Sequence, residues 1–200
     1  MKKTILLALI MVSSITFAQK LKVEDGDIKN LKEITVYNLE FDYTNVQIPK
    51  FDSEEDFLAD KMKKREDKEA GGGEKFKESW YGDREERYRP KFTESFNKRF
   101  DDGEVSVGVN PDAEYTMMVH STRIYAGYNV GVVRRNAEID AVITIFETAN
   151  PDNVLFKGEY TRAQGEGAMG YDFNTGFRIS ECYAKTAKTF AKYIKKKALK

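Results

Sequence analysis

From residue 104 onward, apolar residues recur at every second position, and this alternation constrains the fold more than any other feature. Alternation over several residues is typical of β-strands that bury one face. It predicts strands over 105–107, 115–125, 137–148 and 154–162. Turns are expected at 110–112 and 150–153, where Asn-Pro-Asp sequences occur. Because such short connections favour antiparallel pairing, we expect an antiparallel meander.

The last segment changes to a helical period and predicts a helix over about 175–198. Apolar residues spaced three or four apart share one face of a helix. That face holds Ile179, Tyr183, Ala187, Phe190 and Ile194. The opposite face holds Lys185, Lys188, Lys192 and Lys195. We therefore expect the apolar face to pack on the sheet while the lysines extend into water.

Residues 52–104 are so rich in charge that they predict a solvated helical insertion. They contain 30 charged residues in 53, with closely alternating signs. Ser53 is a suitable N-cap, and acids follow it in the first turn. Helical side chains of opposite charge, four residues apart, support one another. The insertion is interrupted by three consecutive glycines, Gly71 to Gly73.

Aromatic residues in the second part of the insertion are spaced at multiples of four. They are Phe76, Trp80, Tyr88, Phe92, Phe96 and Phe100. This spacing forms one stripe, which is far more typical of a packing face than of a ligand platform. Proline cannot lie within a helix without cost, so we expect a break before Pro90 and a second helix from about that residue to 102–103.

Residues 19–48 have weaker secondary-structure patterns. Residues 19–32 are polar and are expected to be loose, whereas 34–48 predicts a strand ended by Pro49. The expected organisation is a single domain over 33–200 of the α+β class: a mainly antiparallel sheet with helices on one face, plus the charged helical insertion.

The first eighteen residues have the layout of a secretory signal peptide. A basic start, Met1 to Lys3, precedes an apolar run from Ile5 to Val12, and cleavage is expected after Ala18. The apolar run is too short to span a membrane of roughly 30 Å. Position 19 is Gln, so the lipidation cysteine of a bacterial lipoprotein is missing. We expect a periplasmic or secreted protein without a transmembrane segment.

Charge argues against nucleic acid as a partner. Without Lys2 and Lys3 the 33 basic residues fall to 31, against 33 acidic residues, whereas nucleic-acid binders are usually basic. The charge is uneven, because residues 175–200 carry eight basic residues and one acid. Cys182 is the only cysteine, so no internal disulfide is possible.

The familiar catalytic and cofactor motifs fail when their context is considered. Gly165 to Gly170 matches G-x-G-x-x-G, but no βαβ unit can follow in the remaining 30 residues. A loop between the last strand and the last helix is the better interpretation. His120 and Cys182 are a weak thiol–imidazole pair, and too few ligands accompany them for zinc. No catalytic residue, metal or cofactor is assigned.

One group of residues has the composition of a recognition surface, which is often rich in aromatic and arginine side chains. Tyr125, Tyr128, Arg134 and Arg135 flank the loop 126–131, and Tyr171, Phe173 and Arg178 flank the loop before the last helix. If both loops lie at one end of the sheet, they form an aromatic–arginine rim. Ordinary loop packing is the competing interpretation.

The second half of the chain resembles the small α/β domains of secreted Gram-negative envelope proteins related to the curli-secretion lipoprotein CsgG and the penicillin-binding-protein activator LpoB. The resemblance covers roughly 104–198. It rests on the aromatic-glycine loop, Arg134 to Asp140, the strand and turn of 143–151, the glycine-rich loop and the lysine-studded helix. It implies an envelope-associated, non-enzymatic role and carries over no functional residue.

We therefore expect an exported, envelope-associated binding or scaffolding protein without catalysis, whose partner is another envelope protein or an anionic envelope surface. One alternative is a periplasmic protein that binds a small molecule or peptide beneath the loops at Gly127 and Gly165. A second alternative is an enzyme that uses carboxylates, which are too abundant here to single out.

Overall fold

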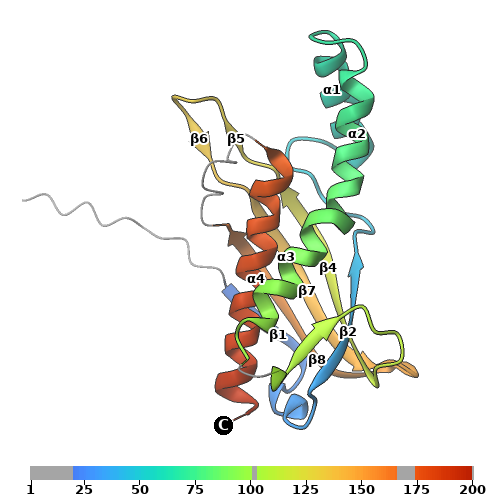
Figure 1. Cartoon of the computed structure of the whole chain (residues 1–200), viewed down its shortest axis with the longest axis vertical. Coiled ribbons are helices and arrows are strands. Elements are labelled where there is room, and N and C mark those ends of the chain that lie inside the picture. The colour runs from blue at the N-terminus through green and yellow to red at the C-terminus, as the bar shows by residue number, and fades with distance from the viewer. Residues whose placement is uncertain (1–19, 101–102, 166–173, 200) are drawn as a thin grey trace, which may run out of the picture.

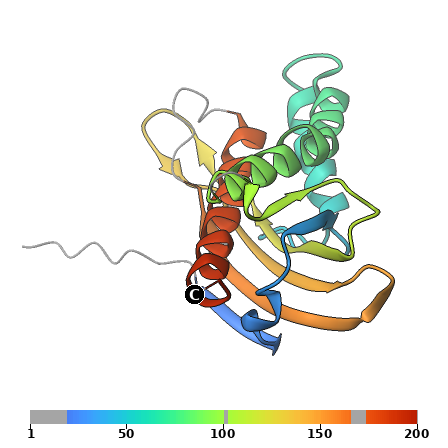
Figure 2. The same ribbon diagram turned by 60° about the horizontal axis from the view of Figure 1, so that its bottom comes forward.

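The computed structural model describes residues 20–100, 103–165 and 174–199. The expected signal peptide lies outside these ranges. Within them the chain forms a mainly antiparallel six-stranded sheet in the order β1-β8-β7-β4-β2-β3, with helices across one face, as Figures 1 and 2 show. This confirms the α+β class. The strands are β1 (Lys20–Gly26), β2 (Val36–Asp42), β3 (Ser106–Gly108), β4 (Tyr115–Tyr125), β7 (Glu138–Glu147) and β8 (Asn150–Gln164).

The meander β4-β7-β8 pairs antiparallel, as the short connections predict. In its register Met117 lies opposite Ile145 and Val119 opposite Ile143, and all four side chains are buried. Strand β2 instead pairs parallel with both β3 and β4. Parallel neighbours need a long crossover connection, and the helical insertion between β2 and β3 supplies it. The charged insertion is thus the crossover of the sheet.

The insertion contains α1 (Glu54–Glu66), α2 (Gly72–Asp83) and α3 (Arg89–Asn97). Ser53 caps α1, because its side chain accepts a hydrogen bond from the Asp56 backbone N–H at 3.0 Å. The α1–α2 hairpin projects beyond the sheet, whereas α3 lies beside α4 (Thr175–Lys197) on the sheet face (Figure 1). The aromatic stripe packs into this core, where Trp80, Tyr88, Phe92, Phe96 and Phe100 are buried.

The expected break before Pro90 is replaced by a π-helical turn, Arg84–Tyr88, which joins α2 to α3 without a loop. Pro90 lies in the first turn of α3, where its missing N–H costs little. A π-turn widens the helix by one residue, and such turns relieve positions where ordinary helical bonding fails. The helix therefore continues through the proline, contrary to the prediction, and ends at Asn97 rather than near 102.

Two further predictions are wrong. Residues 20–26, expected to be loose, form the edge strand β1 against β8, and a 3₁₀ turn at Ile28–Leu31 buries two apolar side chains. An edge strand leaves most side chains in water, so its composition looks like that of a loop. The last hairpin turns at 148–149, because Glu147 already pairs with Asn150. Pro151 is the second residue of β8 and lies at a register shift, where proline is tolerated.

The strand expected over 34–48 is shorter in the structure. β2 ends at Asp42, and only Gln47 regains a bridge, to Arg123. Asp42 accepts the Thr44 backbone N–H, and Asn45 has a positive φ of 57°, so the chain turns away from the sheet there.

The final helix behaves as its period predicts. Ile179, Tyr183, Ala187, Phe190 and Ile194 are all fully buried against the sheet and α3. At its first turn, Gly176 leaves space for the buried Asp83 carboxylate, which pairs with Arg87. A carboxylate is favoured beside a helix N-terminus. This contact joins the α1–α2 hairpin to the main core.

Candidate functional site

A small hairpin follows β4 and carries most of the predicted rim. It consists of β5 (Tyr128–Asn129) and β6 (Arg134–Arg135), which pair antiparallel. Gly131 adopts a positive φ of 84° in the turn, and the Val130 backbone N–H donates to the Val133 carbonyl at 3.1 Å. Gly127 at the base lies so close to the returning strand that a Cβ would come within 2.4 Å of the Arg135 carbonyl oxygen. The hairpin therefore requires glycine at two positions, in its turn and at its base.

The tip of this hairpin, residues 130–133, is apolar and exposed. Val132 is 96% exposed, Val130 is 65% exposed and Val133 is 50% exposed. Directly behind them on β6 come Arg134 and Arg135, both exposed. Burying such valines would release free energy in proportion to the apolar area removed from water. A tip of this kind is typical of a surface that meets another apolar phase or partner.

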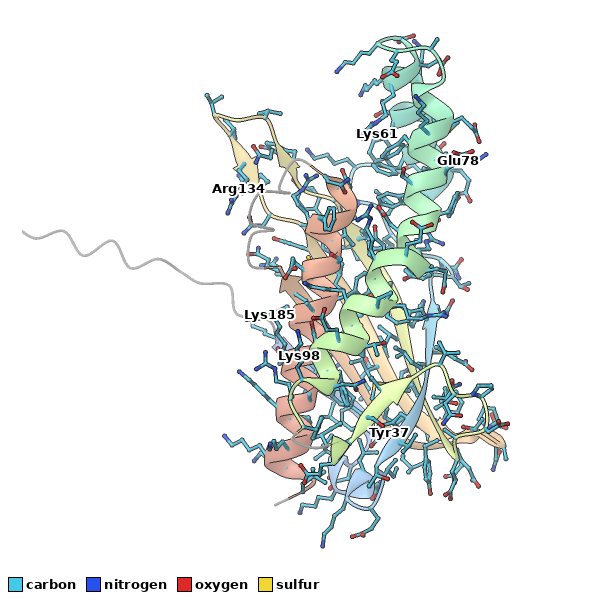
Figure 3. The ribbon with its side chains drawn as sticks, viewed as in Figure 1. Tyr37, Lys61, Glu78, Lys98, Arg134 and Lys185 are labelled. Atoms are coloured by element: carbon cyan, nitrogen blue, oxygen red, sulfur yellow. The ribbon has the colours of Figure 1, made fainter. Side chains whose placement is uncertain are left out.

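Four of the predicted rim residues meet at one cleft, the rim cleft, of about 480 Å³. It is lined by Lys50, Tyr125, Tyr128, Arg134, Arg135, Asn136, Glu138 and Gln164. Figure 3 shows Arg134 on the hairpin, at the end of the molecule where Lys61 lies on the α1–α2 hairpin. The structure thus brings the β4 end and the two arginines of β6 together. Lys50, which also lines the cleft, was not recognised in the sequence.

A network of ion pairs involves Glu138, one of the residues that line the rim cleft. Arg123 on β4 donates to Asp140 at 2.7 Å and to Glu138 at 3.2 Å, both on β7. Burial would lower the pKa of Arg123, but hydrogen bonds and charge from Asp140 and Glu138 outweigh burial and raise it. Gln164 donates to Glu138 at 2.6 Å. These carboxylates are occupied by neighbouring strands, which argues for a positioning role rather than acid–base chemistry.

Arg178 differs from the other rim residues, because it is buried. Its guanidinium donates to the Ala126 carbonyl at 3.2 Å and to the Thr175 hydroxyl at 3.2 Å. It therefore attaches the start of α4 to the loop after β4 and does not line the rim cleft. Tyr171 and Phe173, the other two predicted rim residues, lie outside the described residues.

A second cavity, the insertion pocket, has a volume of about 380 Å³ and lies between the α1–α2 hairpin and the end of β4. Its aromatic lining consists of Phe51, Phe57, Phe76, Tyr125 and Tyr128. The sequence alternative of a pocket beneath the loops at Gly127 and Gly165 did not include the aromatic residues of the insertion. The walls of the insertion pocket come from segments about 70 residues apart along the chain, which no local pattern connects. Gly127 lines it, whereas Gly165 packs against Glu181 of α4 instead.

The thiol–imidazole pair considered from the sequence gains no support. Cys182 is buried, accepts the Gly165 backbone N–H at 3.3 Å and donates to the Arg178 carbonyl at 3.5 Å. Burial raises the pKa of its thiol to about 12, which suppresses the reactive thiolate. His120 contacts the Thr44 carbonyl at 3.0 Å. Each side chain is held by its own neighbours.

Within residues 20–100, 103–165 and 174–199, no group of three or more His, Cys, Asp or Glu side chains is arranged to hold a metal ion. No helix in the described part of the chain is both long and apolar enough to cross a bilayer.

Comparison with known proteins gives little. No family model matches the chain. No curated protein matches it either. Among solved structures it is similar to the PelC dodecamer from Paraburkholderia phytofirmans, with a TM-score of 0.40 and 9% identity over 86% of this chain and 96% of that one. A point variant of that PelC has a TM-score of 0.36 and 10% identity over 84% of this chain and 99% of that one. We infer neither fold nor function from likeness this slight.

Proposed function

We propose that the protein is an exported, non-enzymatic binding protein of the cell envelope, and that the tip of the β5–β6 hairpin attaches it to an anionic lipid surface. The single observation that carries the proposal is the exposure of Val130, Val132 and Val133 directly ahead of two arginines. The signal-peptide layout of residues 1–18 supports export.

The chemistry of the hairpin suits an anionic interface. Between Ala126 and Ala137 the sequence has two arginines and no acid. Fully burying one valine contributes about 1.5–3 kcal/mol. An arginine near an anionic membrane contributes about 1 kcal/mol. Because only the tip is apolar, the attachment should be reversible and weakened by salt.

The lysine face of α4 supports a second candidate surface. Lys192 is exposed and Lys188 is half-buried, and residues 195–197 add three lysines to the last turn. In Figure 1 the C-terminal end of α4 lies at the opposite end of the molecule from the hairpin. Because the two surfaces are far apart, variants can separate them. The lysine face lacks exposed apolar residues of its own in the region that the structure covers, so the hairpin is favoured.

The experiment is vesicle co-sedimentation of the mature protein with phosphatidylcholine alone or mixed with phosphatidylglycerol. We expect binding only to the mixed vesicles, and less binding at high salt. Val132→Asp should weaken it at least about tenfold, because a carboxylate replaces the most exposed apolar contact. The matched control is Val109→Asp, since Val109 is 69% exposed on a different loop.

Two double variants compare the hairpin with the lysine face of α4. Arg134→Gln with Arg135→Gln should reduce binding, whereas Lys188→Gln with Lys192→Gln removes the same charge and should leave most of it. The reverse result would move the attachment to α4. No binding of the wild type to either vesicle would remove the lipid proposal altogether. Export is tested separately, by intact mass of protein from the native envelope, which should begin at Gln19.

A further inference from the structure

The lining of the insertion pocket includes Tyr128 and Asn129 of β5 but none of the tip residues 130–133. Its walls combine two kinds of side chain. Phe57 is buried, and Phe51 and Phe76 are half-buried, so the rings form one apolar surface. The ring centroids of Phe51 and Phe57 are 5.3 Å apart, and those of Phe57 and Phe76 are 6.0 Å apart. A cavity of about 380 Å³ falls in the usual range for small-molecule sites. The pocket can thus hold a compact apolar group.

Every charged side chain that lines this pocket is positive. The four are Lys50, Lys61, Arg65 and Arg178. No aspartate or glutamate occurs among the described lining residues, although acids make up 33 of the 200 residues of the chain. The lining is therefore positive, although Asp60 behind it offsets the charge of Lys61 through an ion pair at 3.0 Å. Such a site attracts anions and repels cations.

Two of the cations lie over the aromatic walls. The Lys61 ammonium is 5.3 Å from the Phe51 ring centre and 5.5 Å from that of Phe57. The Arg65 guanidinium carbon is 3.9 Å from the Phe76 ring centre. Cation–π contacts hold such groups against a ring while leaving their N–H donors available. Because Lys61 also donates to Asp60 at 3.0 Å, Arg65 is the better-placed cation for an anion in the cavity.

Arg65 is the strongest indication of a ligand. It is half-buried, and no ion pair joins it to a carboxylate of the described chain, although its neighbour Lys64 pairs with Asp60 at 2.7 Å. Burial lowers the pKa of Arg65, which means that its charge is incompletely solvated. A buried charge is stabilised when a counter-ion and hydrogen-bond acceptor approach it. Arginine is well suited to a carboxylate or phosphate, which it can bind through two N–H groups.

We propose that the insertion pocket binds a small amphipathic anion, with its apolar body against Phe51, Phe57 and Phe76 and its carboxylate or phosphate group at Arg65 and Lys61. The site differs from the lipid-facing hairpin tip, because the ligand enters it one molecule at a time. It also gives the charged insertion a use beyond crossing the sheet. The ligand class is set by one negative charge and one apolar chain or group that fits a cavity of about 380 Å³.

The test is isothermal titration calorimetry of the mature protein with decanoate and with decyl phosphate, each below its critical micelle concentration. These two probes distinguish a fatty carboxylate from a phosphate monoester as the source of the anion. Decyltrimethylammonium has the same chain and the opposite charge, and decyl glucoside has no charge. We expect at least one anion to bind at a single site, about tenfold or more tighter than the cation and the neutral probe.

Variants then locate the site. Arg65→Gln should weaken anion binding by about tenfold, whereas Lys64→Gln, one residue away on the exposed face of α1, should change it less than about twofold. If Arg65→Gln does not fold, Lys50→Gln tests the same pocket from an exposed position.

Equal binding of anion and cation, or an Arg65→Gln variant that folds and binds like wild type, would overturn the proposal. The vesicle experiment is decided by other residues. Val132→Asp should keep full decanoate or decyl phosphate binding, so failure of the lipid proposal and failure of the pocket proposal are distinguishable.

Discussion

The α4 helix and the α1–α2 hairpin are both helical, but they differ sharply in how much side chain they bury. α4 buries 12 of its 23 residues, whereas α1 buries two of its 13, Phe57 and Leu58. Hydrophobic burial dominates folding free energy, so the two regions cannot be equally stable. The difference shows that a segment of this chain can be a regular helix without contributing many residues to the core.

The α1–α2 hairpin is held by a few specific contacts instead. The Trp80 ring nitrogen donates to Glu54 at 2.6 Å, and Arg84 pairs with the same carboxylate. At its surface, pairs such as Lys63 with Asp67 contribute about 0.3–0.5 kcal/mol each. Regions with few buried apolar contacts open at lower free energy than the core. The insertion pocket lies along this less stable wall, which suits a site that must admit a ligand.

The largest expected effect is in the core. Phe190→Ala should lower the free energy of unfolding by about 3–5 kcal/mol, because it loses burial and leaves a cavity. The ring is fully buried against Phe156 and Tyr160. A domain of this size has about 5–15 kcal/mol in total. Denaturant titration measures the loss, and a wild-type midpoint would show that α4 does not pack as the structure has it.

A smaller effect is expected in the α1–α2 hairpin. Trp80→Ala should lower the free energy of global unfolding by about 1–3 kcal/mol, since its ring packs on a thin two-helix layer. Its closest ring neighbour is Phe57, with centroids 4.7 Å apart. Hydrogen exchange should show lost protection in 54–83 while α4 stays protected. Equal loss in both regions would mean that the insertion and the core unfold as one unit.

The buried thiol predicts a difference at alkaline pH. Burial raises the folded pKa of Cys182 to about 12, whereas an unperturbed thiol has a pKa of 9.0. Because the folded pKa is the higher one, the contribution of the thiol is complete below pH 9 and is lost as pH rises toward 12. The loss is on the order of 1 kcal/mol at pH 10.

Cys182→Ala removes this titration, so the difference in unfolding free energy between wild type and variant should change by on the order of 1 kcal/mol between pH 8 and pH 10. Denaturation at each pH measures it, and the shared tyrosines cancel in the comparison. A gap independent of pH would show that the thiol is solvated. Vesicle binding by the variant should equal that of wild type.

The smallest effects are expected at surface lysines. Lys64→Ala on α1 and Lys188→Ala on α4 should each change stability by less than about 0.5 kcal/mol. Thermal melts of the two variants measure this. If both changes in stability are near zero, the difference in stability between α1 and α4 comes from apolar burial. A larger loss for Lys64→Ala would show that the charge pairs of α1 stabilise it.

The predicted aromatic–arginine rim was only partly accessible from the sequence. Tyr125, Tyr128, Arg134 and Arg135 were identified because aromatic and arginine residues cluster beside a glycine-containing loop, and they do line one cleft. Arg178 was grouped with them by composition, but it is buried and attaches α4 to Ala126. The exposure of the tip valines could not be predicted, because the sequence alone does not show whether an apolar residue is buried.

What the sequence determined by itself was the local character of each segment. The two-residue alternation of 115–125 and the helical spacing from Ile179 to Ile194 became β4 and α4, because a buried face requires that period whatever lies opposite it. What only the tertiary structure decided was pairing between distant segments. Three features are of this kind: the polar strand β1, the parallel pairing of β2 with β4, and the insertion pocket. Each depends on hydrogen bonds or contacts between segments about 70 residues or more apart, and no local sequence pattern reports such contacts.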